Sequence, residues 1–359
     1  MELGQNWTVS HDFAFVLGGA ERVTAAIADA LAGAPVLVFS GQYEVLSSLA
    51  KPESRVSTLE PKFVNESNYR PLLLAHLIAA RSTSVDGNLF ASSYGFSHML
   101  RASGEKIVYC HSPLRQSWSG LADYAATLPA AQRALWTKVF APMYRRIDRS
   151  VSKEVDTYIA TSRAVQSRIW EFYNRESVIL PPPVDPIFFT EDSTLTRDDF
   201  FLWAGRIVEP YKRLGLLIEA IRGTENTLVV VGDGRDRARL EEQAPANVVF
   251  VGSKSTAELA SYYKRARALI MPSEDDFGMV ATEAIASGTP VIAWGRGGAL
   301  DTVTPGLTGV LYKDPSIESI RGAINEFDRN CWDAKKIRDA AQAYSVEHFK
   351  EQVRKLTRA

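Results

Sequence analysis

Short apolar runs alternate along the chain with longer segments whose apolar residues recur at helical spacing. This alternation predicts an α/β fold, in which parallel sheets are wound with helices. The expected strands are Trp7–His11, Val36–Ser40, Asn88–Ala91, Lys106–Cys110, Val155–Ala160, Phe200–Ala204, Thr227–Val231, Val248–Val251, Ala268–Met271 and Val291–Ala293. The expected helices are Ala20–Leu31, Arg163–Tyr173, Leu214–Ile221, Ala257–Ala266, Met279–Ser287, Ile317–Phe327 and Ala334–Ala343. Residues 306–311 are expected to form a small hairpin or a strand.

Three consecutive prolines, Pro181, Pro182 and Pro183, interrupt the pattern near the middle of the chain. They cannot continue a central strand, so they predict a stiff linker between two domains. A length of 359 residues also favours two domains. We expect an N-terminal domain at 1–180 and a C-terminal domain at 181–344, and a final helix within 345–358.

Net charge, hydropathy and cysteine content narrow the classes of protein to which this chain can belong. The net charge is −1, which gives no argument for binding nucleic acid. No run of about 18 apolar residues occurs, and the N-terminus lacks the pattern of a secretory signal. Cys110 and Cys331 are too few for a disulfide framework and have no metal-ligand spacing. The cytoplasm is therefore the expected compartment.

The stretch from Ile270 to Trp294 carries the strongest candidate chemistry. A strand leads into an acidic loop, and a helix and a second strand follow, which together make a βαβ unit. The N–H groups of Phe277, Gly278, Met279 and Val280 are expected at the helix N-terminus, which suits a phosphate. Glu274, Asp275 and Asp276 can simply complement the helix dipole. Glu283 lies on an otherwise apolar helix, so a buried carboxylate there needs a polar partner.

This arrangement of an acidic residue, Phe277-Gly278 and Glu283 resembles the E-x7-E signature of retaining glycosyltransferases of family 4. The segment EAIASGTPVIA from Glu283 to Ala293 continues the family pattern. The family usually has Glu at the first position, where this chain has Asp275 with Glu274 beside it. Either Asp275 keeps the role or Glu274 takes it. The resemblance covers almost the whole chain and implies the GT-B fold, two Rossmann-like domains facing a cleft, with the C-terminal helix (345–359) crossing back to the N-terminal domain.

Two cations, Arg206 and Lys212, lie in the loop that follows Gly205 and precedes a helix. Cations there can stabilise a diphosphate leaving group as its charge grows, and the loop resembles the family's GR-(x)-K pattern. Gly232-Asp233-Gly234 is a weak dinucleotide fingerprint, because Arg237 replaces its third glycine. The resemblance instead implies that Gly232 lies near the nucleoside, with Gly252 and Ser253 close to the base.

In the first half, Gly18-Gly19 precedes a helix and His111 follows a strand. A Gly-Gly pair alone is more often a tight turn. It resembles the family's GGAE loop, which lies under the donor diphosphate. His111 can be a structural histidine bonded to backbone or can line a ligand pocket. Its segment Cys110–Arg115 is similar to the CHTPMR motif of members that use GDP-mannose, which implies a role near the transferred sugar.

The segment from Arg115 to Lys153 mixes tryptophans and other large apolar residues with many arginines and lysines. Its spacing allows either an amphipathic helix that touches a membrane surface or a core helix with a solvated basic face. Because relatives in the family often use lipid-linked acceptors, we favour proximity to the membrane, at its inner face.

The resemblance implies a hexosyltransferase that moves a hexose with retention, most simply mannose from GDP-mannose, to a glycan or a polyprenyl-diphosphate-linked acceptor. It implies no cofactor and no metal ion. Arg206 and Lys212 would bind the diphosphate and Glu283 the ribose, while Asp275 and the backbone of Phe277–Met279 would hold the sugar. The alternatives are a UDP-sugar-dependent transferase of the same fold, a GT-B protein that binds sugar nucleotides without catalysis, and a UDP-sugar 2-epimerase.

Overall fold

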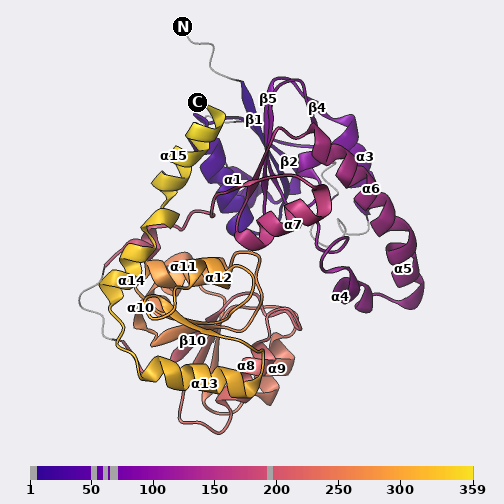
Figure 1. Cartoon of the computed structure of the whole chain (residues 1–359). Helices are drawn as coiled ribbons and strands as arrows, with labels where there is room; N and C mark the ends of the chain where they lie inside the picture. Colours follow the sequence, from indigo (N-terminus) through magenta and orange to yellow (C-terminus); the bar gives the residue numbers. More distant parts are fainter. Residues whose placement is uncertain (1–5, 50–54, 60–63, 65–71, 192–196, 359) are drawn as a thin grey trace. The chain divides into compact units, whose positions relative to one another are not determined.

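The computed structural model of the chain describes residues 6–49, 55–59, 64, 72–191 and 197–358. The chain divides into two compact units. Unit 1 comprises Met1–Pro183 and Phe349–Ala359, and unit 2 comprises Val184–His348. The sequence placed these boundaries after residues 180 and 344. Figure 1 shows that each unit is built of a sheet with helices packed against it.

The main sheet of unit 1 is parallel throughout its described strands. Its order is β3 (Val56–Thr58), β2 (Val36–Gly41), β1 (Trp7–Ala14), β5 (Asn88–Ser93), β7 (Lys106–Cys110), β8 (Thr157–Ala160) and β9 (Val178–Ile179). A separate parallel pair joins β4 (Ser84–Val85) and β6 (Arg101–Ala102).

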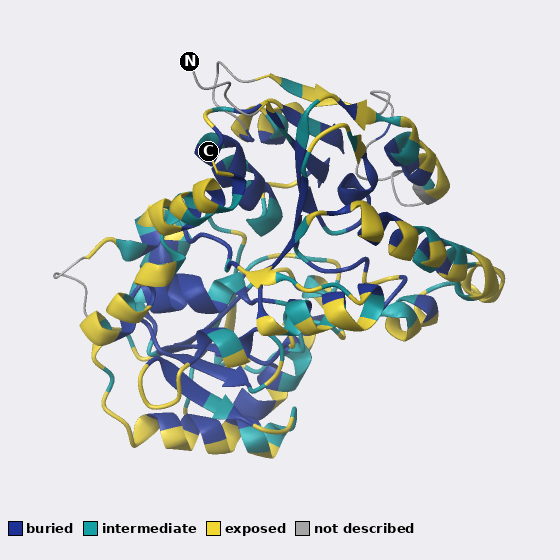
Figure 2. Cartoon of the chain, turned by 45° about the horizontal axis from the view of Figure 1, so that its top comes forward, coloured by how far each residue is buried: buried dark blue, intermediate teal, exposed yellow. Residues whose placement is uncertain are grey.

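Helices cover the unit 1 sheet, and the sheet is apolar on both faces. In β5, Leu89 and Ala91 join one apolar cluster while Phe90 joins the other. Such two-sided burial is typical of parallel sheets, and the strands accordingly are the dark interior of Figure 2. The helices are α1 (Gly19–Ala30), α2 (Tyr43–Ser48), α3 (Leu73–Ser82), α4 (Leu121–Ala126), α5 (Ala130–Leu135), α6 (Ala141–Val151) and α7 (Arg163–Tyr173), with shorter turns η2 (Ser97–Met99) and η4 (Ser152–Glu154).

The C-terminal helix α15 (Val346–Thr357) contributes its later residues to unit 1. Phe349 and Val353 are buried in the same apolar cluster as Ile27 of α1. The Lys350 ammonium lies 2.6 Å from the Asp29 carboxylate, which adds an ion pair to this apolar contact. The end of the chain thus completes the core of the first unit.

Unit 2 also has a parallel sheet. Its order is β12 (Val248–Gly252), β11 (Leu228–Val231), β10 (Phe201–Ala204), β13 (Ala268–Met271), β14 (Val291–Trp294) and β15 (Gly309–Tyr312). Residues 306–311 do not form a hairpin, because β15 pairs in parallel with β14. The helices are α8 (Leu214–Ile221), α9 (Arg237–Gln243), α10 (Thr256–Arg265), α11 (Met279–Ala286), α12 (Ala299–Thr302), α13 (Ile317–Asp328) and α14 (Ala334–Ala340), with η5 (Pro186–Phe189) and η6 (Gln342–Tyr344).

The strand order of both units creates a point where the chain changes direction across the sheet. In unit 2, β11 lies on one side of β10 and β13 on the other, so the loops after β10 and β13 leave in opposite directions. In unit 1, β2 and β5 flank β1 in the same way. Ligands of open parallel sheets bind at such switch points, beyond the carboxyl ends of the strands.

Candidate functional site

Glycines bring the loops after β10, β11 and β12 into backbone contact. The Gly205 N–H donates to the Val231 carbonyl at 3.0 Å, and the Gly232 N–H donates to the Gly252 carbonyl at 2.9 Å. A Cβ atom added to Gly232, where φ is +136°, would lie 1.9 Å from the Gly205 carbonyl oxygen. Only glycine permits this approach. The predicted donor-binding glycines 205, 232 and 252 therefore form one backbone surface, and exposed Ser253 follows directly.

At the switch point of unit 2, a cation from one loop meets an anion from the other. The Lys212 ammonium donates to both oxygens of Asp275, each at 2.8 Å. Their side chains are 30% and 17% exposed, so the pair is accessible to a ligand. Two residues predicted to bind the donor are thus brought together as an ion pair.

The other cations of the β10 loop differ in how they are held. Arg206 is exposed and makes no hydrogen bond or ion pair with any residue that the structure describes. The Arg213 guanidinium lies over the Trp294 ring, 4.4 Å from its centroid, a favourable cation–π distance. Arg206 is therefore the cation of this loop that can reach a ligand without first breaking a contact.

The acidic loop is supported by the loop that follows β14. The Gly298 N–H donates to the Asp275 carbonyl at 2.9 Å. A Cβ atom on Gly297 would lie 2.4 Å from that carbonyl oxygen, and one on Gly298 would lie 2.1 Å from the Phe277 carbonyl. Small residues are needed at 297 and 298 for the two loops to touch. The sequence analysis assigned no role to Gly297 and Gly298, although two adjacent glycines in a loop can indicate a close approach of two backbones.

The residues that open α11 present backbone rather than side chains. Gly278 has φ of +86° and precedes the first helical residue, Met279. The Phe277 side chain is buried and its ring packs edge-on against Tyr344 at 5.9 Å. Met279 and Val280 are half-buried. Any ligand contact from Phe277 must come from its main chain.

Glu283 lies on the second turn of α11 and is 8% exposed. The hydroxyl of buried Tyr263 donates to Glu283 Oε2 at 3.1 Å, so the carboxylate has the polar partner that its burial requires. Burial, followed by the Glu283 charge, raises the pKa of Tyr263 well above its usual value.

In unit 1, the Gly18–Gly19 loop is fixed by a side chain of the helix that it precedes. The Gly18 N–H donates to Glu21 Oε2 at 2.9 Å. The other oxygen of Glu21 lies 3.4 Å from His11 Nε2. The Gly18 N–H is therefore occupied by protein, and a phosphate at this loop would have to use other N–H groups.

His111 directly follows the last residue of β7 and is partly exposed. Its Nε2 lies 2.8 Å from the Ser92 hydroxyl. Burial, and to a lesser extent the neighbouring His11, lowers the pKa of His111 to about 3. The imidazole is therefore neutral at physiological pH and can donate or accept a hydrogen bond without changing its charge.

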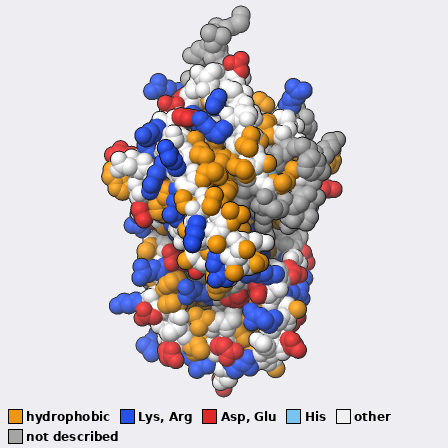
Figure 3. All heavy atoms as spheres, turned by 90° about the vertical axis from the view of Figure 1, so that its right-hand side faces the viewer, with side chains coloured by type: hydrophobic (Ala, Val, Ile, Leu, Met, Phe, Trp, Pro, Cys, Tyr) orange, Lys and Arg blue, Asp and Glu red, His pale blue; other side chains and the backbone are white. Residues whose placement is uncertain are grey.

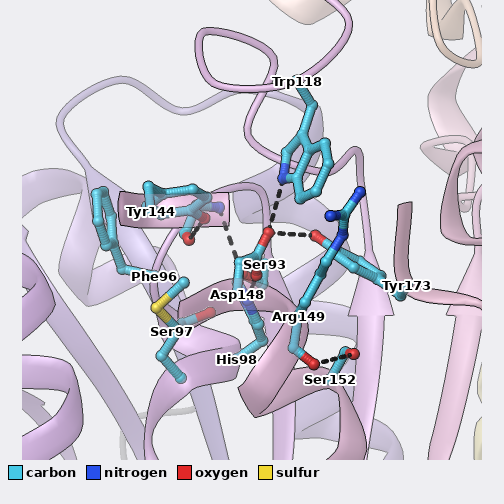
Figure 4. A network of polar contacts seen from close by, with 12 residues as sticks. Ser93, Phe96, Ser97, His98, Trp118, Tyr144, Asp148, Arg149, Ser152 and Tyr173 are labelled. Carbon is cyan, nitrogen blue, oxygen red and sulfur yellow. Dashed lines mark hydrogen bonds and ion pairs between the residues drawn. The ribbon is translucent and has the colours of Figure 1, made fainter. Parts of the chain in front are cut away.

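A separate polar network inside unit 1 has the composition of a hydrolytic triad (Figure 4). Ser93 Oγ lies 2.8 Å from His98 Nδ1, and His98 Nε2 lies 2.7 Å from Asp148 Oδ1. Trp118 and Tyr173 also donate to Asp148, each at 2.8 Å.

This network is part of the core. Ser93, His98 and Asp148 are all buried, and the neighbouring cavity has a volume of about 10 Å³, enough for one water molecule. A substrate carbonyl cannot reach Ser93, so we assign the network to stability.

Within the described ranges, no cluster of His, Cys, Asp or Glu is arranged to hold a metal ion. Nor does any helix of those ranges combine the length and apolar character needed to cross a bilayer.

Comparisons with known proteins agree with this architecture. Residues 188–344 match the family described as "Glycosyl transferases group 1". A GDP-mannose-dependent alpha-mannosyltransferase of Mycobacterium tuberculosis is 40% identical over 30% of this chain and 29% of its own length. A GDP-mannose-dependent alpha-(1-6)-phosphatidylinositol monomannoside mannosyltransferase of Mycolicibacterium smegmatis is 26% identical over 63% of this chain and 70% of its own length.

The alignments with the first curated relatives span half of those proteins or less. Among solved structures, Alr3699/HepE of Anabaena in complex with UDP and glucose has a TM-score of 0.71. It is 17% identical, and the alignment covers 99% of this chain and 100% of that one. At this identity the likeness shows the fold alone.

Proposed function

We propose that the protein is a retaining glycosyltransferase, because residues 188–344 match the glycosyl transferases group 1 family and the chain has the GT-B fold. The observation that carries the proposal is the ion pair between Lys212 and Asp275 at the switch point of unit 2, in the same loop region as exposed Arg206. A cationic loop suits a diphosphate, and a carboxylate beside it suits the hydroxyl groups of a sugar.

Unit 2 is proposed to hold the donor. Arg206 and Lys212 bind the diphosphate, and Asp275 exchanges its bond to Lys212 for a bond to the sugar. The backbone of residues 277–280 lies at the N-terminus of α11, where N–H groups favour anions and hydroxyl oxygens. Gly205, Gly232 and Gly252 offer a surface without side chains to the nucleoside, and Glu283 holds the ribose hydroxyls.

The reaction breaks the bond between the anomeric carbon and the donor phosphate, and forms a bond to an acceptor oxygen on the same face. The proton of the acceptor hydroxyl passes to the departing phosphate, so no side-chain nucleophile is required. Negative charge grows on the phosphate as the bond breaks. Arg206 and Lys212 lower the barrier because they stabilise that charge more in the transition state than in the bound donor.

We propose mannose, carried by GDP, as the transferred hexose. The similarity of the His111 segment to that of GDP-mannose enzymes supports this choice, as do mannosyltransferases among the relatives. The acceptor is proposed to be a glycan or a lipid-linked glycan.

A thermal-shift panel with GDP-mannose, UDP-glucose and ADP-glucose tests the donor. The proposal expects the largest stabilisation from GDP-mannose, by mass action on the folded state. A preference for a UDP-sugar would replace the donor but keep the reaction. Binding without any turnover would identify a non-catalytic binding protein and contradict the proposal.

We further propose that unit 1 contacts an anionic membrane surface through the helical run from α5 through η3 (Trp136–Phe140) to α6. In this run, Leu135 and Val139 are 62% and 54% exposed. Arg145, Arg146, Arg149 and Lys153 line a hollow of about 460 Å³ on α6 and η4. Figure 3 shows hydrophobic side chains gathered beside lysines and arginines on the face of the N-terminal unit that is turned to the viewer. Apolar groups next to cations suit an interface with anionic lipids.

The opposite expectation, a core helix with a solvated basic face, applies in part. The buried residues of α6 are Ala141, Tyr144, Asp148 and Val151, whereas α5 buries no residue.

Sedimentation with phosphatidylglycerol vesicles distinguishes the two interpretations. Binding that salt weakens, and that Arg146→Glu with Lys153→Glu abolishes, supports the contact. Equal sedimentation of the wild type and this variant would contradict it, with Lys336→Glu in unit 2 as the control for a charge reversal elsewhere.

A further inference from the structure

A continuous chain of buried polar groups connects the Gly18–Gly19 loop to His111. From the Gly18 N–H it passes through four side chains, which we call the relay: Glu21, His11, Thr24 and Ser92. The Gly18 nitrogen lies 2.9 Å from Glu21 Oε2, and Glu21 Oε1 lies 3.4 Å from His11 Nε2. His11 Nδ1 lies 3.0 Å from Thr24 Oγ1. Thr24 Oγ1 lies 2.9 Å from Ser92 Oγ, which in turn lies 2.8 Å from His111 Nε2.

The relay is built by the sheet and the first helix. His11 of β1 and Ser92 of β5 are directly paired across neighbouring strands. Glu21 and Thr24 both come from α1. His11, Thr24 and Ser92 are fully buried, so their polar groups depend on one another for hydrogen bonds.

The first link of the relay has a determined direction. His11 Nδ1 lies 3.2 Å from the Ser92 carbonyl oxygen, and His11 Nε2 faces the Glu21 carboxylate. The Ser92 carbonyl oxygen can only accept, because a carbonyl carries no proton. His11 Nδ1 is therefore placed to donate, both to this carbonyl and to Thr24 Oγ1 at 3.0 Å.

A donor at the head of a hydrogen-bond chain orients the hydroxyl groups that follow. Each oxygen turns toward the preceding hydrogen and its own hydrogen turns away from it, and each bond polarises the next. Thr24 then accepts from His11 and donates to Ser92, and Ser92 donates to His111 Nε2. The competing acceptor for the Thr24 hydrogen is the Ala20 carbonyl at 2.9 Å, which lies within the helix.

We propose that the relay fixes His111 in the tautomer that carries its hydrogen on Nδ1, so that His111 presents a hydrogen-bond donor to the substrate. Nδ1 of His111 makes no hydrogen bond within the described part of the chain, and the residue as a whole is partly exposed. Glu21, His11, Thr24 and Ser92 are positioning residues that act through His111. The inference rests on the proposed function only for the identity of the substrate, an oxygen of the transferred sugar.

Nitrogen-15 NMR of the histidine-labelled full chain tests the tautomer without any activity assay. The expected spectrum of wild type shows a protonated Nδ1 and an unprotonated Nε2 for His111, assigned by loss of the signals in His111→Gln. Thr24→Val removes the hydroxyl with little change in shape. In this variant the Ser92 oxygen loses its donor, and His111 is expected to shift toward the tautomer protonated on Nε2.

Two controls accompany this test. Thr24→Ser keeps the hydroxyl and should keep the wild-type tautomer. Ser10→Ala removes a buried hydroxyl of β1, the strand that also carries His11. This hydroxyl bonds to the Ser97 carbonyl and lies outside the relay, so the variant should also leave the tautomer unchanged. A wild-type His111 protonated on Nε2, or a tautomer unchanged in Thr24→Val, would overturn the proposal. If Thr24→Val does not fold, Ser92→Ala, which removes the hydroxyl that lies 2.8 Å from His111 Nε2, takes its place with the same expected shift.

Kinetics then show whether the tautomer serves the reaction. Loss of one neutral hydrogen bond to the sugar corresponds to a fall in kcat/KM of about tenfold in Thr24→Val, with GDP binding unchanged and with recovery in Thr24→Ser. Normal kinetics in a variant whose tautomer has shifted would refute the role of the donor. Absence of turnover by the wild type with any sugar nucleotide would contradict the proposed function instead and leave the NMR result to stand alone.

Discussion

Replacing Asp275 by alanine should change nucleotide binding and turnover in opposite directions. In the structure both Asp275 oxygens lie 2.8 Å from the Lys212 ammonium. Removing the carboxylate releases that cation for the diphosphate and takes away a negative charge close to it. The attraction between the released Lys212 ammonium and the diphosphate acts across about 5 Å at the protein surface and is worth about 1 kcal/mol. Solvent reduces it to this value because the Lys212 and Asp275 side chains are 30% and 17% exposed. GDP should therefore bind about fivefold more tightly.

Turnover should fall in the same variant. If Asp275 holds a hydroxyl of the sugar, the charge-assisted hydrogen bond that is lost is worth roughly 1.5–3 kcal/mol, which corresponds to about a ten- to a hundredfold decrease in kcat/KM. The fold should persist, because a partly exposed ion pair contributes about 1 kcal/mol or less to the free energy of unfolding. Isothermal titration with GDP, steady-state kinetics and a thermal melt give the three quantities.

Glu274→Ala is the matched control, since it removes a neighbouring exposed carboxylate from the same loop. It should leave both GDP affinity and turnover near the wild-type values. Asp275→Asn separates charge from shape and should reproduce the tighter binding of GDP. Weaker binding of GDP to Asp275→Ala would refute the reasoning. A severe loss of turnover in Glu274→Ala with a mild one in Asp275→Ala would assign the sugar contact to Glu274.

Further predictions concern the rest of the site. Arg206→Ala should reduce turnover at saturating donor by about a hundredfold with an unchanged melting temperature, since Arg206 is exposed and bonds to no described residue; near-normal turnover would remove it from the mechanism. Activity should persist in excess EDTA, and loss of activity that magnesium or manganese restores would demand a metal site. Tyr263→Phe should lower the free energy of unfolding by about 1 kcal/mol, because Glu283 loses its buried donor. Gly232→Ala should destabilise the protein far more than Gly223→Ala, since both glycines have positive φ but only Gly232 would clash; equal melting temperatures would contradict this.

Much of the fold could be predicted from the sequence because each expected strand is a short apolar run. The alternation in β10 and β13 sends neighbouring side chains to opposite apolar clusters, which is the physical origin of those runs. Short or exposed elements such as α2, β3 and α9 left no such pattern. Residues 306–311 were ambiguous between a hairpin and a strand, because the parallel pairing of β15 with β14 depends on contacts between segments distant in sequence.

The candidate site was predictable in its parts and less so in its contacts. Loop positions identified Lys212 and Asp275, but their pairing depends on the strand order that makes β10 and β13 neighbours. The relay was missed, although polar residues inside apolar strands were a usable signal, as in Ser10-His11-Asp12 of β1 and Ser92-Ser93 of β5. Buried polar residues at strand ends need partners, and only the tertiary structure shows which ones.

The most direct test of the proposed retaining transfer is proton NMR of GDP-mannose incubated with the protein. In the absence of an acceptor, water should slowly take its place. Our account predicts that α-mannose appears first, before it equilibrates with the β-anomer, and that Arg206→Ala abolishes its formation. Release of β-mannose first would contradict retention. No release of sugar from GDP-mannose, or from UDP- and ADP-sugars tested in the same way, would contradict glycosyl transfer itself.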